Sequence, residues 1–212
     1  MVIQKVAIFG AGGHGRVAAD IFEQSGFRVI GMFDDDKAKI GELSGKWSIL
    51  GTFDQFRGLL KNKQIFYFVA IGDNTTRENI TERISSIVKR NPCNCISEKA
   101  IVSNNIKLGK GILISPGAVI NVGVSIGDGV IVNTSASIDH DCQLGNFSSV
   151  QPGAILGGSV IVGKRAMVGL GAVVRQNIVI GNDAIIGGGA MVVKNVKEKT
   201  IVMGIPAKVA II

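Results

Sequence analysis

The feature that most constrains the fold of this chain is an aliphatic residue at every sixth position along most of its C-terminal half. The rule holds without exception at Ile96, Val102, Leu108, Ile114, Ile120, Ile126, Val132, Ile138, Leu144, Val150, Leu156, Val162, Val168, Val174, Ile180, Ile186 and Val192. The positions two residues earlier are mostly small, as at Ala118 and Ala136. Six residues make one short strand and one corner, and three such units make a triangular coil that stacks on the next. We therefore expect residues 94–212 to form a parallel β-helix with the aliphatic side chains inside.

Glycines mark the same period. Gly109, Gly127, Gly145, Gly163 and Gly181 recur every eighteen residues, each directly after an aliphatic residue. We expect them to relieve the corners, where a positive φ is often needed. The final segment, EKTIVMGIPAKVAII, leaves the repeat and is expected to cap the open end of the helix, whose strand edges would otherwise be exposed.

Residues 1–93 follow a different rhythm, in which short apolar runs alternate with segments of helical periodicity. Continuous apolar runs of this kind are typical of buried parallel strands, and their alternation with helices indicates a small α/β sheet. The pattern therefore predicts an N-terminal Rossmann-like domain. The expected strands are residues 5–10, 28–36 and 65–74, and the expected helices are residues 16–26 and 75–90.

Composition narrows the range of ligands and locations. The net charge of +7 could suggest nucleic-acid binding, but aromatic residues make up only 5% and clustered Lys/Arg runs are missing. We expect no nucleic-acid partner; basic residues such as Lys164, Arg165 and Arg175 instead favour a small polyanionic ligand. The three cysteines lack metal-ligand spacing, so no metal is expected. The sequence shows no signal peptide and no apolar run of membrane length, which favours a cytoplasmic enzyme with no membrane span.

One of the only two histidines interrupts the repeat, in the segment SASIDHDCQLG. The period places Ile138 and Cys142 inside the coil, so His140 and Asp141 must project outward from a corner. A carboxylate that accepts from one imidazole nitrogen fixes the tautomer and makes the other nitrogen a better base. His140 is therefore a candidate general base, and either Asp139 or Asp141 could orient it.

A second motif, Gly10-Ala-Gly-Gly-His-Gly15, follows the first strand and precedes a helix. Asp34 to Asp36 come about twenty residues later, where a dinucleotide-binding fold holds a ribose. Taken alone, this pattern predicts NAD. A domain of about ninety residues with three strands is small for a full dinucleotide fold, however. The same glycine loop would equally bring backbone N–H groups to the pyrophosphate of a nucleotide sugar.

Five motifs along the whole chain, GAGGHG, FDDD, FVAIGDN, IDHDCQLG and GIPAK, carry a family resemblance. The chain resembles the sugar O/N-acetyltransferases of the sialic-acid O-acetyltransferase type, and most closely the bacterial nucleotide-amino-sugar N-acetyltransferases of the UDP-N-acetylbacillosamine and GDP-perosamine kind. The resemblance implies a left-handed β-helix. It also implies an acetyl-CoA-dependent N-acetyltransferase of glycan biosynthesis, acting on the amine of a nucleotide-linked amino sugar. His140 would be the base, assisted by Asp141.

The resemblance also implies binding residues. Those expected to meet the sugar nucleotide are Gly12, Gly13, His14, Asp34, Asp35 and Gly72. Ser149, Leu170 and Gly188 would contact acetyl-CoA in a cleft between the subunits of a homotrimer. At Ser149 some relatives carry histidine in a stretch like FSHV, whereas this chain reads FSSV, which weakens the case for a side-chain contact there.

Two other functions stay open on the sequence. The first is an O-acetyltransferase of a sialic acid or another sugar hydroxyl, and the second is an NAD- or nucleotide-sensing module on a structural β-helix. The sequence does not distinguish UDP from GDP, and it does not identify the sugar.

Overall fold

The computed structural model describes residues 3–210, and the chain divides into two compact units, residues 1–98 and 99–212. The sequence pattern changes at residue 93, a few positions before this division. Residues 1–2 and 211–212, which the sequence assigns to the outer ends of the two domains, lie outside the described residues. No helix within residues 3–210 combines the length and the apolar character needed to cross a bilayer.

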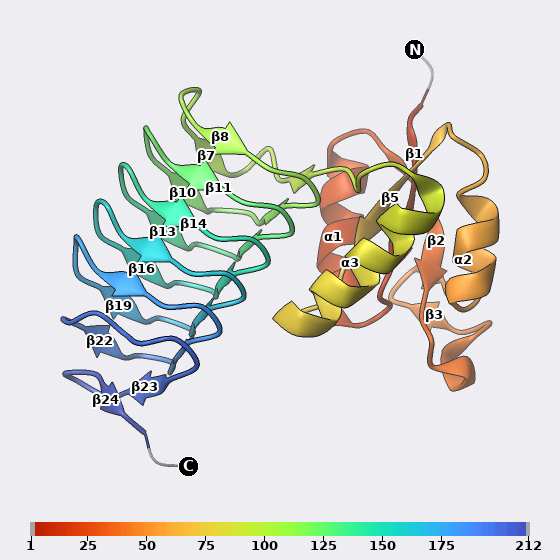
Figure 1. The fold of residues 1–212 in the computed structure, drawn as a ribbon. Helices are drawn as coiled ribbons and strands as arrows, with labels where there is room; N and C mark the ends of the chain where they lie inside the picture. The colour runs from red at the N-terminus through yellow and green to blue at the C-terminus, as the bar shows by residue number, and fades with distance from the viewer. Residues whose placement is uncertain (1–2, 211–212) are drawn as a thin grey trace. The chain divides into compact units, whose positions relative to one another are not determined.

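The N-terminal unit is built on a three-stranded parallel sheet in the order β2-β1-β5 (Figure 1). The strands and helices expected from the sequence are present, although two strands are shorter than expected. The second strand ends at Phe33, before the three aspartates, and the third ends at Val69. The elements are β1 (Lys5–Phe9), α1 (Gly13–Gln24), β2 (Arg28–Phe33), a 3-10 turn η1 (Lys37–Lys39), β3 (Leu43–Ser44), β4 (Trp47–Ser48), α2 (Phe53–Leu59), β5 (Ile65–Val69), α3 (Asn74–Val88) and β6 (Cys95–Ile96).

Helix α2 and the β3–β4 hairpin are elements that the sequence pattern did not locate. Helix α2 has only seven residues and contains Gly58, so its periodicity is weak. Its start is set by Gln55, whose Oε1 accepts a hydrogen bond from the backbone N–H of Thr52 at 3.0 Å. Phe53 and Phe56 are buried in the core of the unit, which explains why so short a helix forms.

The sheet is covered on both faces. Phe22 of α1 packs against Phe68 on one face, with ring centroids 5.6 Å apart. On the other face Phe56 of α2 lies 5.3 Å from Phe9 and 5.0 Å from Phe33, and Ile84 of α3 joins the same cluster. This two-sided burial is what a parallel sheet requires, and it leaves the loops after the strands free to form a site.

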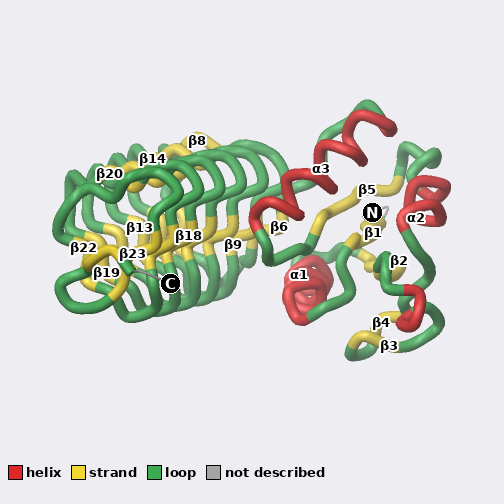
Figure 2. The backbone as a smooth tube through the Cα atoms, turned by 60° about the horizontal axis from the view of Figure 1, so that its bottom comes forward, coloured by secondary structure: helices red, strands yellow, loops and turns green. Residues whose placement is uncertain are grey.

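The C-terminal unit is a parallel β-helix whose coils stack as a regular ladder (Figure 2). The first wall contains β7 (Ile101–Val102), β10 (Val119–Ile120), β13 (Ser137–Ile138), β16 (Ile155–Leu156), β19 (Val173–Val174) and β22 (Met191–Val192). The second wall contains β8 (Lys107–Leu108), β11 (Ser125–Ile126), β14 (Gln143–Leu144), β17 (Ile161–Val162) and β20 (Val179–Ile180). The third wall contains β9 (Leu113–Ile114), β12 (Ile131–Val132), β15 (Ser149–Val150), β18 (Met167–Val168), β21 (Ile185–Ile186), β23 (Ile201–Met203) and β24 (Lys208–Val209).

The aliphatic residues of the six-residue period fill the interior, as predicted. From Ile114 to Val192 every one of them is buried, and small partners such as Ala136 and Ala154 are also fully enclosed. Burial of one such side chain is worth roughly 1.5–3 kcal/mol, so the repeat itself supplies the driving force for stacking. At the other end of the series Leu108 is exposed. Beyond the repeat, β23 adds in parallel to β21 and β24 pairs antiparallel to β23, which ends the parallel ladder on the third wall.

The glycines that recur every eighteen residues serve a purpose other than the one expected. Gly127 and Gly145 do not have positive φ; instead, a Cβ at Gly145 would lie 2.7 Å from the backbone N of Lys164 in the next coil. These glycines therefore permit close stacking of coils. The positive φ falls two residues later, where non-glycine residues such as Phe147, with φ 57°, adopt it too. Asp141, at the corner after the first wall, has φ 60°.

Candidate functional site

The corner after β13 carries an exposed histidine–aspartate pair. His140 Nδ1 lies 2.9 Å from Asp141 Oδ2, and the two side chains keep 55% and 65% of their surface exposed. Ile138 and Cys142 on either side are buried. The six-residue register predicted that His140 and Asp141 would project outward while Ile138 and Cys142 point into the coil.

Asp141 contacts the imidazole from the corner position that has a positive φ. Aspartate tolerates the left-handed backbone conformation that the repeat imposes at this position. Asp139, the other acidic neighbour, faces different partners, because its Oδ1 accepts hydrogen bonds from the backbone N of His140 at 2.8 Å and from Asn121 Nδ2 at 2.9 Å. In the structure, Asp141 is therefore the carboxylate that holds the ring.

The electrostatics of this corner favour a basic imidazole. The hydrogen bond that His140 donates to Asp141, followed by the charge of Asp139, raises the pKa of His140 above its ordinary value of 6.5. With Nδ1 bonded to the carboxylate, the neutral ring carries its proton there and leaves the Nε2 lone pair to accept another. Cys142 offers no competing nucleophile, since burial raises the pKa of its thiol and its Sγ donates to the carbonyl of Gly157 at 3.2 Å.

The glycine loop before α1 contains two kinds of glycine. A Cβ at Gly10 or at Gly15 would collide with backbone carbonyl oxygens, those of Ala70 and Gly10 respectively, so the fold needs both glycines. Gly12 and Gly13 are exposed, and no backbone of another segment lies within 4 Å of where their Cβ atoms would be. Helix α1 begins at Gly13 without a side-chain cap, which leaves an open helix N-terminus suited to an anion.

His14 lies in the same loop but differs from the two open glycines. Burial, helped by the nearby charge of Arg77, lowers the pKa of His14 to about 4. Its Nε2 is enclosed and has no hydrogen-bond partner among the described residues. At neutral pH this imidazole is uncharged, so it cannot act as a cation toward a phosphate.

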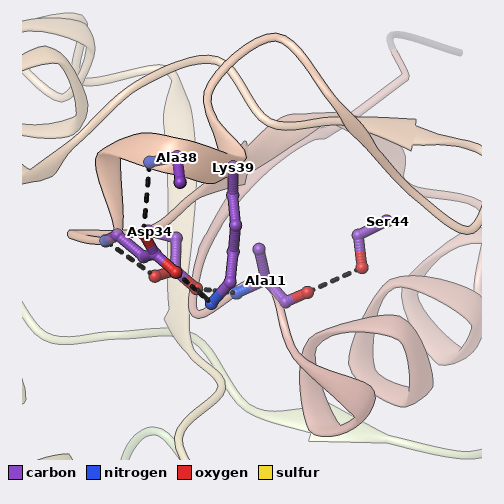
Figure 3. Close-up of polar contacts among 6 residues, drawn as sticks. Ala11, Asp34, Ala38, Lys39 and Ser44 are labelled. Carbon is purple, nitrogen blue, oxygen red and sulfur yellow. Dashed lines mark hydrogen bonds and ion pairs between the residues drawn. The ribbon is translucent and has the colours of Figure 1, made fainter.

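The aspartates after β2 hold loops together (Figure 3). Asp34 accepts hydrogen bonds from the backbone N of Ala11 at 3.1 Å and of Asp36 at 3.0 Å, and Lys39 Nζ lies 3.4 Å from it. Burial opposes ionisation of Asp34, but these backbone hydrogen bonds and Lys39 lower its pKa below the usual value. Asp35 Oδ1 accepts from the backbone N of Phe53 at 3.0 Å, at the start of α2.

Asp34 and Asp35 also line a pocket of about 240 Å³ at the ends of the parallel strands. Phe9 at the end of β1 and Gly10 directly after it also line the pocket, and Ile71, Thr76 and Ile80 complete it. Ligands of open α/β sheets bind at this edge. The structure thus brings Asp34 and Asp35 together at one pocket, next to the loop that carries Gly12 and Gly13.

Gly72, expected in the same site, is exposed, and its carbonyl accepts from Arg77 Nη1 at 3.0 Å. Arg77 also donates to the carbonyl of Ile71 at 2.9 Å and is only 2% exposed. This buried guanidinium fixes the loop from inside, a role that sequence reasoning missed. The available signal was an arginine on the inward phase of helix α3.

The residues expected to contact acetyl-CoA fall into two groups. Leu170 is 62% exposed at the corner after the third wall, and Gly188 takes the same position one coil later. His140 stands at the corner after the first wall, so these residues do not share a corner with it. Ser149 is fully buried and its Oγ accepts from Gln151 Nε2 at 3.2 Å, which excludes a side-chain contact with a ligand in this unit.

Among the basic residues considered for an anionic ligand, Arg165 is committed to an ion pair. Its Nε and Nη2 donate to the two carboxylate oxygens of Asp183 at 2.6 and 2.8 Å. Arg175 is exposed. Across the described part of the chain, no group of three or more His, Cys, Asp or Glu side chains could hold a metal ion.

Comparison with known proteins shows which families and structures this chain resembles. The PglD N-terminal domain family matches residues 5–84. UDP-N-acetylbacillosamine N-acetyltransferase of Bacillus subtilis is 32% identical over 114 residues, covering 53% of this chain and 51% of that protein. The chain spans about half or less of the length of the curated relatives that it matches.

Solved structures match nearly the whole chain. A variant of perosamine N-acetyltransferase from Caulobacter crescentus, in complex with CoA and GDP-perosamine, is 34% identical with a TM-score of 0.91, covering 99% of this chain and 98% of its own. The acetyltransferase domain of PglB from Neisseria gonorrhoeae, in complex with acetyl coenzyme A, is 33% identical with a TM-score of 0.91, covering 99% and 100%. These matches confirm the predicted left-handed β-helix following an α/β unit.

Proposed function

The chain belongs to the family of acetyl-CoA-dependent sugar acetyltransferases that includes the perosamine and bacillosamine N-acetyltransferases, and from this premise we propose that it acetylates the amine of a nucleotide-linked amino sugar. The observation that carries the proposal is the end-to-end likeness to an enzyme solved with both CoA and GDP-perosamine. The exposed His140–Asp141 pair supplies the chemistry that such a transfer needs.

The proposed reaction is a direct transfer. The amine nitrogen attacks the thioester carbonyl carbon of acetyl-CoA, and the carbonyl π electrons move to oxygen. His140 Nε2 takes the proton that the amine loses, while Asp141 stabilises the imidazolium through Nδ1. The tetrahedral intermediate collapses, the C–S bond breaks, and CoA leaves as a thiolate. The thiolate takes up the proton that His140 received, which restores the base. A general base in this position typically contributes about 10²–10⁴-fold to the rate.

The acceptor would use the N-terminal unit. We propose that its pyrophosphate lies at the open start of α1, against Gly12 and Gly13, because no backbone of the fold occupies that space. The nucleoside or sugar would enter the pocket beside Asp34 and Asp35, with Gly72 nearby. His14, being neutral and largely enclosed, would contribute shape and loop structure to this site rather than charge.

The acetyl-CoA site is proposed to form between subunits of a homotrimer. His140 and Leu170 stand at the two corners that flank the first wall, so a site that uses both needs a neighbouring copy. The first wall also carries exposed aliphatic side chains, Ile101 at 68% and Ile155 at 46%, which a neighbour would cover. Sedimentation of the wild type and of Ile155→Asp tests this arrangement. We expect a trimer that is weakened by the charge, and a monomeric wild type contradicts the proposal.

We propose that the reaction takes place in the cytoplasm, where acetyl-CoA and nucleotide sugars would both be available. Cys93, Cys95 and Cys142 are free thiols, which suits a reducing compartment.

The experiment that tests the function is a thiol-release assay with acetyl-CoA and a panel of UDP- and GDP-linked amino sugars, with sialic acids as hydroxyl acceptors. Release with a nucleotide amino sugar, and a mass gain of one acetyl group on the amine, is the expected result. Release only with a hydroxyl acceptor would make the protein an O-acetyltransferase. Thermal stabilisation by NAD, without thiol release with any acceptor, would assign the glycine loop to a dinucleotide.

A further inference from the structure

Gly158 lies one coil after His140, at the same position of the same corner. A Cβ built on Gly158 would lie 2.6 Å from Cε1 and 2.6 Å from Nε2 of His140, far inside van der Waals contact. Gly158 is itself buried although it belongs to a corner of the coil. The imidazole thus occupies the space that a side chain at residue 158 would take.

The backbone does not account for this glycine. Gly158 is not among the residues with positive φ, so its conformation is open to any residue. Its neighbour Gly157 is different, because a Cβ there would lie 2.7 Å from the backbone N of Gln176, and the stacking of the coils requires the glycine. At Gly158 the three nearest atoms all belong to the imidazole of His140.

The same corner position in the flanking coils carries side chains. Val122 occupies it one coil before His140, and Gln176 occupies it one coil after Gly158. Both residues are exposed. The corner therefore accepts side chains of ordinary size, and the missing one stands where the ring of His140 lies.

We propose that Gly158 is a positioning residue, whose lack of a side chain seats the imidazole of His140 in its hydrogen bond with Asp141. The ring would otherwise be pushed off the coil and away from Nδ1···Oδ2 contact. Gly123 leaves room for Asp141 on the opposite side, since a Cβ there would collide with Asp141 Oδ1. Gly123 also has φ 77°, so a substitution there would strain the backbone as well. Gly158→Ala is the cleaner test.

The effect on the ring can be measured without substrate. The chain has two histidines, so NMR titration of histidine-labelled protein gives two resonances, which His140→Ala assigns. In Gly158→Ala the pKa of His140 should fall back toward 6.5, because the ring loses its carboxylate partner. Gln176→Ala, which places an alanine at the same corner one coil further on, should leave that pKa unchanged. An unaltered pKa in Gly158→Ala overturns the proposal.

A double-mutant cycle on thermal unfolding covers the case in which Gly158→Ala is poorly folded. The substitution should lower the unfolding midpoint in the wild-type background by about 2–4 °C. In a His140→Ala background, where no imidazole fills the space, Gly158→Ala should leave the unfolding midpoint unchanged. An equal loss in both backgrounds would show that the alanine clashes elsewhere, which contradicts the proposal.

The kinetic consequence rests on the proposed function: Gly158→Ala should reduce turnover at least tenfold while the KM for acetyl-CoA changes little, because the ring is displaced and not removed. The two proposals fail separately. Suppose that the wild type acetylates no amino sugar, but that the pKa of His140 and the double-mutant cycle behave as stated. The proposed function is then wrong, while the positioning role of Gly158 is supported. If the wild type acetylates an amino sugar but Gly158→Ala behaves like Gln176→Ala in every measurement, the positioning role of Gly158 is wrong and the proposed function is supported.

Discussion

The two units of the chain hold one histidine each, in opposite surroundings. His14, at the start of α1, is enclosed, lacks a partner for Nε2 among the described residues, and has a pKa lowered to about 4 by burial. His140, on a corner of the β-helix, is half exposed, bonded to Asp141, and has its pKa raised above 6.5. The same side chain is thus held neutral in one unit and made more basic in the other.

This difference shows what each unit can contribute. A general base needs an accessible nitrogen and a partner that stabilises the protonated ring, and of the two histidines only the one on the β-helix has both. The N-terminal unit presents open backbone at Gly12 and Gly13 and a pocket beside Asp34, which suit binding rather than proton transfer. We therefore propose that the first unit binds the acceptor and that the second supplies the base.

The largest effect should come from His140→Gln. Loss of the base should reduce turnover by about 100-fold or more, and thermal unfolding should change little because the ring is exposed. Thiol release measures the rate, and calorimetry checks the fold. Turnover close to that of the wild type would mean that the amine loses its proton to water.

Asp141→Asn should have the next largest effect on the rate, about tenfold, because an amide at this position cannot stabilise the imidazolium. The pKa of His140 should fall, which moves the acid limb of the pH–rate profile to lower pH. Asp139→Asn is the matched control, since its carbonyl oxygen can still accept from the backbone N of His140. A larger loss of rate in Asp139→Asn than in Asp141→Asn would transfer the orienting role to Asp139.

The two kinds of glycine in the N-terminal loop allow a paired test. Gly12→Ala should leave stability unchanged and raise the KM for the nucleotide sugar several-fold, because the new methyl group enters the space proposed for the pyrophosphate. Gly10→Ala should destabilise the unit by about 1–3 kcal/mol, because φ is 109° and a Cβ would meet the carbonyl of Ala70. Isothermal titration and urea unfolding separate the two effects. Unaltered binding of the nucleotide sugar by Gly12→Ala would contradict the proposal that the pyrophosphate lies against this loop.

The buried histidine should affect stability in acid rather than turnover. His14 is neutral in both folded and unfolded chains above pH 6.5; below that, the unfolded chain binds a proton that the folded chain refuses until about pH 4. Folding should therefore lose up to about 3 kcal/mol between those values through this group. Urea unfolding at pH 7 and pH 4.5 should show a smaller loss for His14→Gln than for the wild type. His140→Gln, where the pKa shift has the opposite sign, should not reduce the loss, and equal losses in all three proteins would contradict the assignment to His14.

Much of the β-helix could be predicted because an aliphatic side chain must fill the interior at every sixth residue, and this requirement recurs at many positions. That period also placed His140 and Asp141 outside the coil, between the buried Ile138 and Cys142. The reason for the glycines was harder to predict, because Gly145 meets a neighbouring coil and Gly158 meets a side chain eighteen residues away. The contact of Asp35 with the start of α2 and the contact of the buried Arg77 with Gly72 could not be predicted for the same reason, since both depend on how the loops fold.

The most direct test of His140 as the base compares two titrations of the same protein. One is the pKa of the His140 imidazole from NMR, and the other is the acid limb of kcat/KM for the amino-sugar acceptor, both measured in the wild type and in Asp141→Asn. We expect the limb and the imidazole pKa to coincide above pH 6.5 in the wild type and to move down together in the variant. A limb that stays in place while the imidazole pKa moves would contradict the role of His140 as the base.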